Sequence, residues 1–435
     1  MKTAKRLLVL MLCAATLLWG TAALAAAAPE QDGSQRLEPP TLGNAWMAML
    51  YEESTDTILF AHRENTVNPP ASMTKVMTAV LVLEHNPDLS GSMTVPAEAI
   101  SPEYCYWLED NHLLEGEEIS IHDLMKYLLI PSGNEAGTTL AVHVAGDIPT
   151  FIDMMNAKAQ ELGMTNTYYA DPHGLSPDSK ISSQDMITLC RYAMQFDLFR
   201  EIVSTKAAAI TTNYRTMRFG TTNRVMDPGY VVDYQTDFAD DVIGIKTGFI
   251  TPAGLNLATC MVHDDLTFYC VVMHGSYVPA TNSYDGQVGG HHLDTIKLLK
   301  YARAFSKQGF GAGEAVTNVN MWGAFGKPFP AVAQEDVYIL SQTGRNMTIA
   351  FDKVGTSVKQ GDVIGTVTLA DEFGNVRTTA LLAGQDASMN LLLIGLIIGG
   401  GALLIAGAVV AIVLTARKRK AAQPQAAEEA PGAEA

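Results

Sequence analysis

Three short clusters of polar residues in this 435-residue chain could act together on a carbonyl group. The first is Ser72-Met73-Thr74-Lys75, in which a hydroxyl and an amine stand three residues apart and would share one face of a helix. The amine of Lys75 could take the proton of the Ser72 hydroxyl, provided that its own pKa is lowered. Taken alone, the motif is equally compatible with a solvated helix face.

The second cluster is Pro131-Ser132-Gly133-Asn134, at the junction of two helical patterns. The hydroxyl of Ser132 and the carboxamide of Asn134 could relay a proton and orient an amide substrate. The alternative is that one of these residues only caps the helix that begins near Glu135, since both types are common caps. The cluster therefore supports a catalytic role only if the fold places it beside the other clusters.

The third cluster is Lys246-Thr247-Gly248, which follows the apolar run 242–245. Lys246 could hold a substrate carboxylate and Thr247 could hydrogen-bond it. Gly248 would let a ligand come close to the backbone, because glycine has no side chain. The positive charge of Lys246 would also help to keep a nearby Lys75 amine neutral. Taken alone, the tripeptide favours a turn after a strand over a binding role.

Apolar patterning predicts the elements that would position these clusters. Strands are predicted on both sides of a polar turn and in a later hairpin, at 46–51, 57–60, 255–261 and 267–273. Helices are predicted at 72–84, 121–129, 148–162 and 293–305. His291-His292 is expected to begin the last helix, which closes the domain.

Beyond Gly309 the sequence changes to short strands separated by turns. The clearest of them are 337–340, 347–351, 364–369 and 376–382. We therefore expect a large domain at 42–308, followed by a small all-β domain at 309–386.

The amino-terminal residues have the composition of a secretory signal. Basic residues precede the apolar run Leu7–Trp19, and small residues at Ala23 and Ala25 suit cleavage near Ala25. We expect a signal peptide at 1–25, with an uncleaved anchor as the alternative, and a linker at 26–41.

The carboxy-terminal part contains a second apolar segment, Leu391–Thr415, which carries no charge. As a helix it would be about 37 Å long and could span a bilayer with some tilt. The basic run 417–420 follows it and favours a cytoplasmic position for the tail, 416–435. These features predict a single-pass protein of the cell membrane whose larger part lies outside the cytoplasm.

Charge and composition narrow the classes of partner. The formal net charge of −17 argues against nucleic acid as a partner. The histidines lack the H-x-x-x-H and H-E-x-x-H spacings, so no catalytic metal is expected. Four cysteines follow the signal: Cys105, Cys190, Cys260 and Cys270. Cys260 and Cys270 could face each other across the predicted hairpin, but buried free cysteines are also common, and the pairing stays open.

The order S-x-x-K, S-x-N, K-T-G is the signature set of penicillin-binding proteins and class A β-lactamases. The chain resembles the low-molecular-mass D-alanyl-D-alanine carboxypeptidases, the serine peptidases of family S11, over roughly 45–309. The resemblance is carried by longer phrases around the motifs: 68–75, 128–136, 159–164, 171–175 and 244–254. It implies a mixed α/β fold like that of β-lactamases and transpeptidases, an antiparallel sheet flanked by helices. A small all-β domain and one carboxy-terminal transmembrane helix would follow.

The resemblance also implies roles for residues of the first two motifs. Ser72 would attack the carbonyl between two D-alanines while Lys75 takes its proton. Ser132 and Asn134 would help to protonate the leaving amine. The backbone N–H groups of Ser72 and Phe249 would hold the oxyanion.

In the third motif Lys246, with Thr247 and Gly248, would hold the terminal carboxylate of the substrate. The implied substrate is a peptidoglycan stem peptide that ends in D-Ala-D-Ala, with β-lactams as inhibitors and no cofactor. The phrase 180–186 departs from the usual family pattern, which puts substrate preference and deacylation rate in doubt. The apolar segment 391–415 also differs from the amphipathic anchors of many relatives.

Three alternatives stay open. A β-lactamase would share the motifs, but no E-x-x-L-N phrase is present to supply its water-activating glutamate. A DD-endopeptidase or transpeptidase could form the same acyl-enzyme. A catalytically idle scaffold that binds the cell wall through its β domain would not need intact motifs.

Overall fold

The computed structural model describes residues 24–25, 36–101, 111–227, 237–279, 287–321, 328–344, 346–352 and 354–421. Most of the predicted signal and linker, Cys105 and the tail beyond 421 lie outside these ranges.

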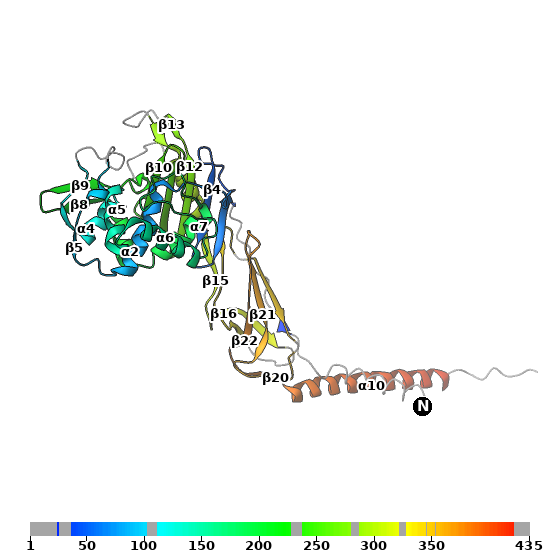
Figure 1. The fold of residues 1–435 in the computed structure, drawn as a ribbon. Coiled ribbons are helices and arrows are strands. Elements are labelled where there is room, and N and C mark those ends of the chain that lie inside the picture. Colours follow the sequence, from blue (N-terminus) through cyan, green and yellow to red (C-terminus); the bar gives the residue numbers. More distant parts are fainter. Residues whose placement is uncertain are drawn as a thin grey trace, which may run out of the picture.

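A five-stranded antiparallel sheet forms the centre of the larger body (Figure 1). Its strands, in spatial order, are β10 (Val242–Ile250), β11 (Gly254–His263), β12 (Leu266–Gly275), β2 (Met47–Glu52) and β3 (Thr57–His62). Apolar residues alternate between two hydrophobic clusters, because both faces of the sheet are covered. On β12, Tyr269, Val271 and Met273 belong to one cluster, and Phe268, Cys270 and Val272 belong to the other.

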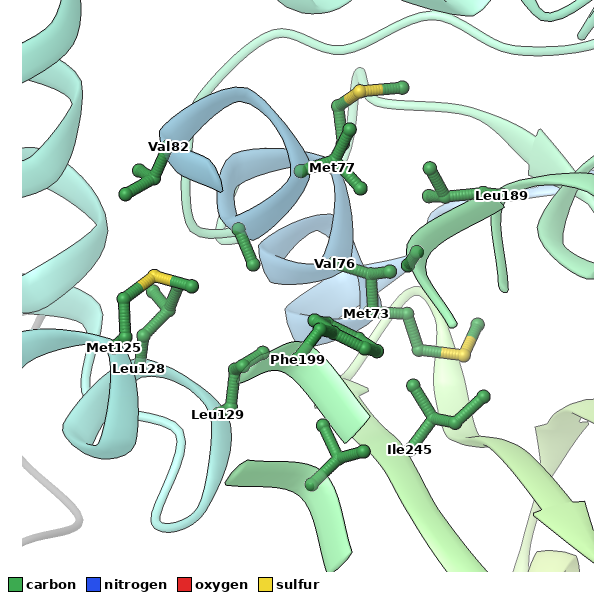
Figure 2. Packing of buried hydrophobic residues seen from close by; sticks show 14 of the residues in the cluster. Met73, Val76, Met77, Val82, Met125, Leu128, Leu129, Leu189, Phe199 and Ile245 are labelled. Carbon is green, nitrogen blue, oxygen red and sulfur yellow. The ribbon is translucent and has the colours of Figure 1, made fainter. Parts of the chain in front are cut away.

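Helices cover the two faces unequally. On one face pack α2 (Lys75–His85), α4 (Ile121–Leu129), α5 (Asn134–Ala145), α6 (Ile148–Glu161), α7 (Ser183–Ala193) and α8 (Asp197–Ser204). The other face is covered by α9 (Gly290–Ala302). Figure 2 shows apolar side chains around α2 meeting others from α4, α7, α8 and β10. The helix that follows Ser72 is therefore held in the centre of the molecule.

Short elements complete the larger body. They are η1 (Ala71–Thr74), η2 (Ala97–Ala99), η4 (Arg224–Met226), β4 (Val67–Asn68), β5 (Ser92–Thr94), β6 (Glu118–Ser120), β7 (Ile181–Ser182), β8 (Ala207–Thr211), β9 (Thr216–Gly220), β13 (Tyr277–Pro279) and β14 (Gln287–Gly289).

The second body is a β-sheet module with its own hydrophobic cluster. Its elements are β15 (Ser306–Phe310), β16 (Ala315–Met321), β17 (Phe329–Ala333), β18 (Val337–Ser341), β19 (Asn346–Phe351), β20 (Ser357–Val358), β21 (Val363–Ala370), β22 (Val376–Ala383) and β23 (Ala387–Ser388), and β1 (Leu24–Ala25) pairs with β16. The rings of Phe305 and Phe373 lie 5.5 Å apart, and Arg377 donates to the carbonyl of Thr55 at 3.0 Å. These contacts join the module to the larger body.

The last element, α10 (Leu391–Ala421), extends away from the rest of the chain (Figure 1). Its segment Leu391–Lys418 is long and apolar enough to cross a membrane, and none of its most apolar stretch is buried inside the protein.

The fold expected from the resemblance is confirmed, although the bounds of several elements differ from those predicted. The closing helix α9 begins at Gly290 and ends at Ala302, three residues before the predicted end, because residues 303–305 form turns instead. Cys260 and Cys270 do not pair. The register sets Cys260 opposite Tyr269 and Cys270 opposite Thr259, so the two thiols lie on opposite faces of the sheet, both free.

Candidate active site

Ser72 and Lys75 meet where a short 3₁₀ turn runs into a buried helix. Ser72 lies in η1 and Lys75 is the first residue of α2. The Nζ atom of Lys75 is 2.8 Å from the Ser72 Oγ and donates to the Asn134 Oδ1 and the His173 carbonyl, each at 2.7 Å. The Lys75 side chain is fully buried, which excludes the solvated helix face as its role.

In the Ser132–Asn134 cluster, Asn134 contacts Lys75, and both Ser132 and Asn134 line the pocket described below. No side chain caps α5, whose cap position is Gly133, so neither Ser132 nor Asn134 serves as the cap. Ser132 adopts a φ of 72°, and its buried hydroxyl has no hydrogen-bond partner within the described part of the chain. A side chain at Gly133 would collide with the Tyr127 ring, since a Cβ there would be 2.1 Å from it. The tight turn therefore presents both polar groups to the site.

The Lys246–Gly248 cluster lies on β10, at the edge of the central sheet. Lys246 is buried and its Nζ donates to the Thr247 carbonyl at 3.0 Å, while the Thr247 hydroxyl lies 2.6 Å from that of Thr222. A Cβ at Gly248 would be 3.0 Å from the Ser72 nitrogen, so only glycine lets β10 approach the Ser72 segment this closely. Ser72 thus lies beside the backbone of the third cluster.

The loop 171–176, for which the sequence predicted no role, fixes the position of Lys75. The carboxylate of Asp171 accepts from the backbone N–H groups of His173 at 2.8 Å and Ser176 at 2.5 Å. This folds the loop so that the His173 carbonyl faces Lys75, and the Thr78 hydroxyl anchors it by donating to the Pro172 carbonyl at 2.6 Å. Its only sequence signal was the family-like phrase 171–175.

These segments enclose a pocket of about 410 Å³. Its lining includes Ser72, Ser132, Asn134, Leu175, Thr222, Arg224, Thr247, Gly248, Phe249, Leu255, Tyr277, Gly289, His291 and His292. His291 and His292 do begin the closing helix, as expected, but they also form part of the pocket wall, which the sequence did not indicate. Burial lowers the pKa of His291 to about 3, so its ring is neutral at physiological pH.

Burial also controls the charge of the two lysines. It lowers the pKa of Lys75 to about 7, against the opposing influence of Asp171 and Glu135. Burial and then the neighbouring Lys75 hold the pKa of Lys246 well below its usual range. Removal from water is thus the main cause of the low pKa of Lys75, and the expected help from the charge of Lys246 stays a prediction. A lysine with a pKa near 7 can accept a proton at neutral pH.

An antiparallel sheet between helices, with a serine, a buried lysine and a K-T-G strand at one pocket, defines the class of active-serine penicillin-recognising proteins. The chain belongs to the peptidase S11 family, described as D-alanyl-D-alanine carboxypeptidase, whose model matches residues 34–276.

Individual relatives agree with this assignment. The chain is 25% identical over 371 residues to the D-alanyl-D-alanine carboxypeptidase DacF of Bacillus subtilis, covering 82% of this chain and 88% of that one. It is 30% identical over 282 residues to the D-alanyl-D-alanine endopeptidase of Escherichia coli, covering 62% and 86%. The crystal structure of penicillin binding protein 6B from Escherichia coli has the same fold, with a TM-score of 0.59, 22% identity and coverage of 82% and 99%.

Proposed function

We propose that this protein is a serine D-alanyl-D-alanine carboxypeptidase that acts through an acyl-Ser72 intermediate. The observation that carries the proposal is the contact of a buried Lys75 amine with both Ser72 and Asn134, beside the open pocket. In the proposed reaction the Ser72 oxygen bonds to the carbonyl carbon of the penultimate D-alanine and its proton passes to Lys75. The peptide C–N bond then breaks, and the departing amine takes a proton through Ser132.

The charge that develops on the carbonyl oxygen needs donors close to Ser72. The backbone N–H groups of Ser72 and Phe249 would supply them, and the close approach of Gly248 to the Ser72 nitrogen supports this assignment. Lys246 and Thr247 would bind the terminal carboxylate, which would in turn favour the charged form of Lys246. Water then attacks the acyl-enzyme and restores Ser72.

The full-length protein in detergent, given a stem pentapeptide ending in D-Ala-D-Ala, should release one D-alanine per peptide, measured with a D-amino acid oxidase assay. Cleavage confined to cross-linked dimers would instead indicate an endopeptidase. Rapid turnover of penicillin would indicate a β-lactamase, and the absence of every reaction would leave the scaffold alternative.

The pH dependence of acylation should report the state of Lys75. Because only the neutral amine can accept the serine proton and the pKa of Lys75 is about 7, the acylation rate should be constant at alkaline pH and fall below pH 7. The decrease should approach about tenfold per pH unit. The measurement is the second-order rate constant for penicillin between pH 5 and 9, with circular dichroism to verify folding. A flat profile would contradict the role of Lys75 as base.

We further propose that residues 1–25 are a signal peptide, and that a large domain at 42–308 is followed by a small β domain at 309–386. We also propose that 391–415 spans the cell membrane with the catalytic part outside. The exposed apolar surface of α10 supports the last point. A chain that ends at Asn390 should leave the membrane fraction and appear in the medium or periplasm, as judged by immunoblotting after fractionation. Full retention in the membrane would contradict this arrangement.

A further inference from the structure

Two exposed aromatic side chains stand at the mouth of the pocket. Phe249 and Tyr277 are 46% and 53% exposed, and their rings meet edge to face with centroids 6.1 Å apart. Both line the pocket, but the proposed chemistry uses only the backbone of Phe249 and no part of Tyr277. Large apolar groups exposed beside a binding site are typical of ligand contacts.

The sheet register connects these side chains into one apolar surface. Phe249 lies directly opposite Leu255 in the β10–β11 pair, and Leu255 lies opposite Gly275 in the next pair. Gly275 adds no side chain between Leu255 and the following Tyr277. We call the surface of Phe249, Leu255 and Tyr277 the aromatic platform.

The β13–β14 hairpin holds the platform in place. Tyr277 pairs with Gly289, and the neighbouring Ser276 both donates to the Asn44 carbonyl at 3.3 Å and accepts from the Gly290 N–H at 2.8 Å. The ring of Tyr277 is thus attached to a braced backbone, which suits a preformed subsite.

Strand geometry indicates which part of a substrate would reach the platform. Thr247 and Phe249 are two residues apart on one face of β10, a separation of about 6.6 Å. We place the terminal carboxylate at Thr247 and the scissile carbonyl beside Gly248 and Ser72. Two residues of an extended peptide also span about 6.6 Å. Its third residue, the one before the two D-alanines, then lies level with Phe249.

We propose that the aromatic platform binds the side chain of this third stem residue and selects a long aliphatic chain over a short one. This inference rests on the proposed carboxypeptidase function and adds to it the determinant of substrate preference. Apolar discrimination at such a site is worth about tenfold or more in kcat/KM.

The test compares two peptides that differ only in the third side chain: Nα-acetyl-L-norleucyl-D-Ala-D-Ala and Nα-acetyl-L-alanyl-D-Ala-D-Ala. The full-length protein in detergent should hydrolyse the norleucyl peptide with about tenfold higher kcat/KM. Tyr277→Ala should reduce this preference to about threefold or less, mainly through loss of the norleucyl rate. Tyr277→Phe should retain it, because the ring and not the hydroxyl makes the contact.

Tyr214→Ala is the matched control, since Tyr214 is an even more exposed tyrosine outside the pocket lining. It should behave as wild type, and penicillin acylation of each variant verifies folding. Equal hydrolysis of both peptides by the wild type, or an unchanged preference in Tyr277→Ala, would overturn the inference and leave the proposed function standing. Release of D-alanine from neither peptide would overturn the proposed function, and the inference with it.

Discussion

Replacing Ser72 with alanine should lower kcat for D-alanine release by about 10⁶-fold, because the acyl-enzyme can no longer form. The folded state should be little affected, since the side chain loses one oxygen and Ser72 forms part of a short turn rather than the core. The measurement is D-alanine release at saturating pentapeptide, with thermal melting to verify the fold.

Ser357→Ala provides a control, because Ser357 is exposed and lies in β20 of the second body. It should retain full activity. If Ser72→Ala kept more than about one percent of wild-type kcat, a different nucleophile would have to be found.

Replacing Lys75 with methionine should slow acylation by about 10⁴-fold, the upper range for loss of a general base. Methionine fills much of the same buried space but cannot accept a proton. The change also removes the donor that serves the Asn134 Oδ1 and the His173 carbonyl, so a loss of about 1–3 kcal/mol of stability should accompany it. Stopped-flow acylation and denaturant unfolding measure the two effects separately.

Lys126→Met is the corresponding control, since Lys126 lies on α4, is partly exposed and pairs with Asp123. It should acylate at the wild-type rate. A Lys75→Met variant that acylates within about tenfold of wild type would assign proton transfer to another group.

The elements that carry the three motifs could be predicted from sequence because local patterns define them. The spacing of Ser72 and Lys75 and the apolar runs of the hairpin at 255–273 each reflect the period of a single helix or strand. α4 was predicted to the residue, since Ser120 caps it and Leu129 ends its apolar pattern. The family resemblance then indicated that the motifs meet.

Contacts between segments that are distant in sequence could not be predicted from such local patterns. The His173 carbonyl reaches Lys75 across 98 residues, and nothing local to residues 171–176 shows that this loop folds against α2. The burial of His291 and His292 in the pocket wall depends on how α9 packs on the sheet. The helices α7 and α8 were not predicted, although their buried apolar residues recur at helical spacing, at 186, 187, 189, 190 and 193 in α7 and at 199, 202 and 203 in α8.

The most direct test of Ser72 as the acylating nucleophile is the intact mass of the full-length protein in detergent after exposure to penicillin, followed by peptide mapping. We expect a mass gain of one penicillin per chain, located on the peptide that contains Ser72 and absent from Ser72→Ala. An absence of adduct on the folded wild type, or an adduct that persists in Ser72→Ala, would contradict it.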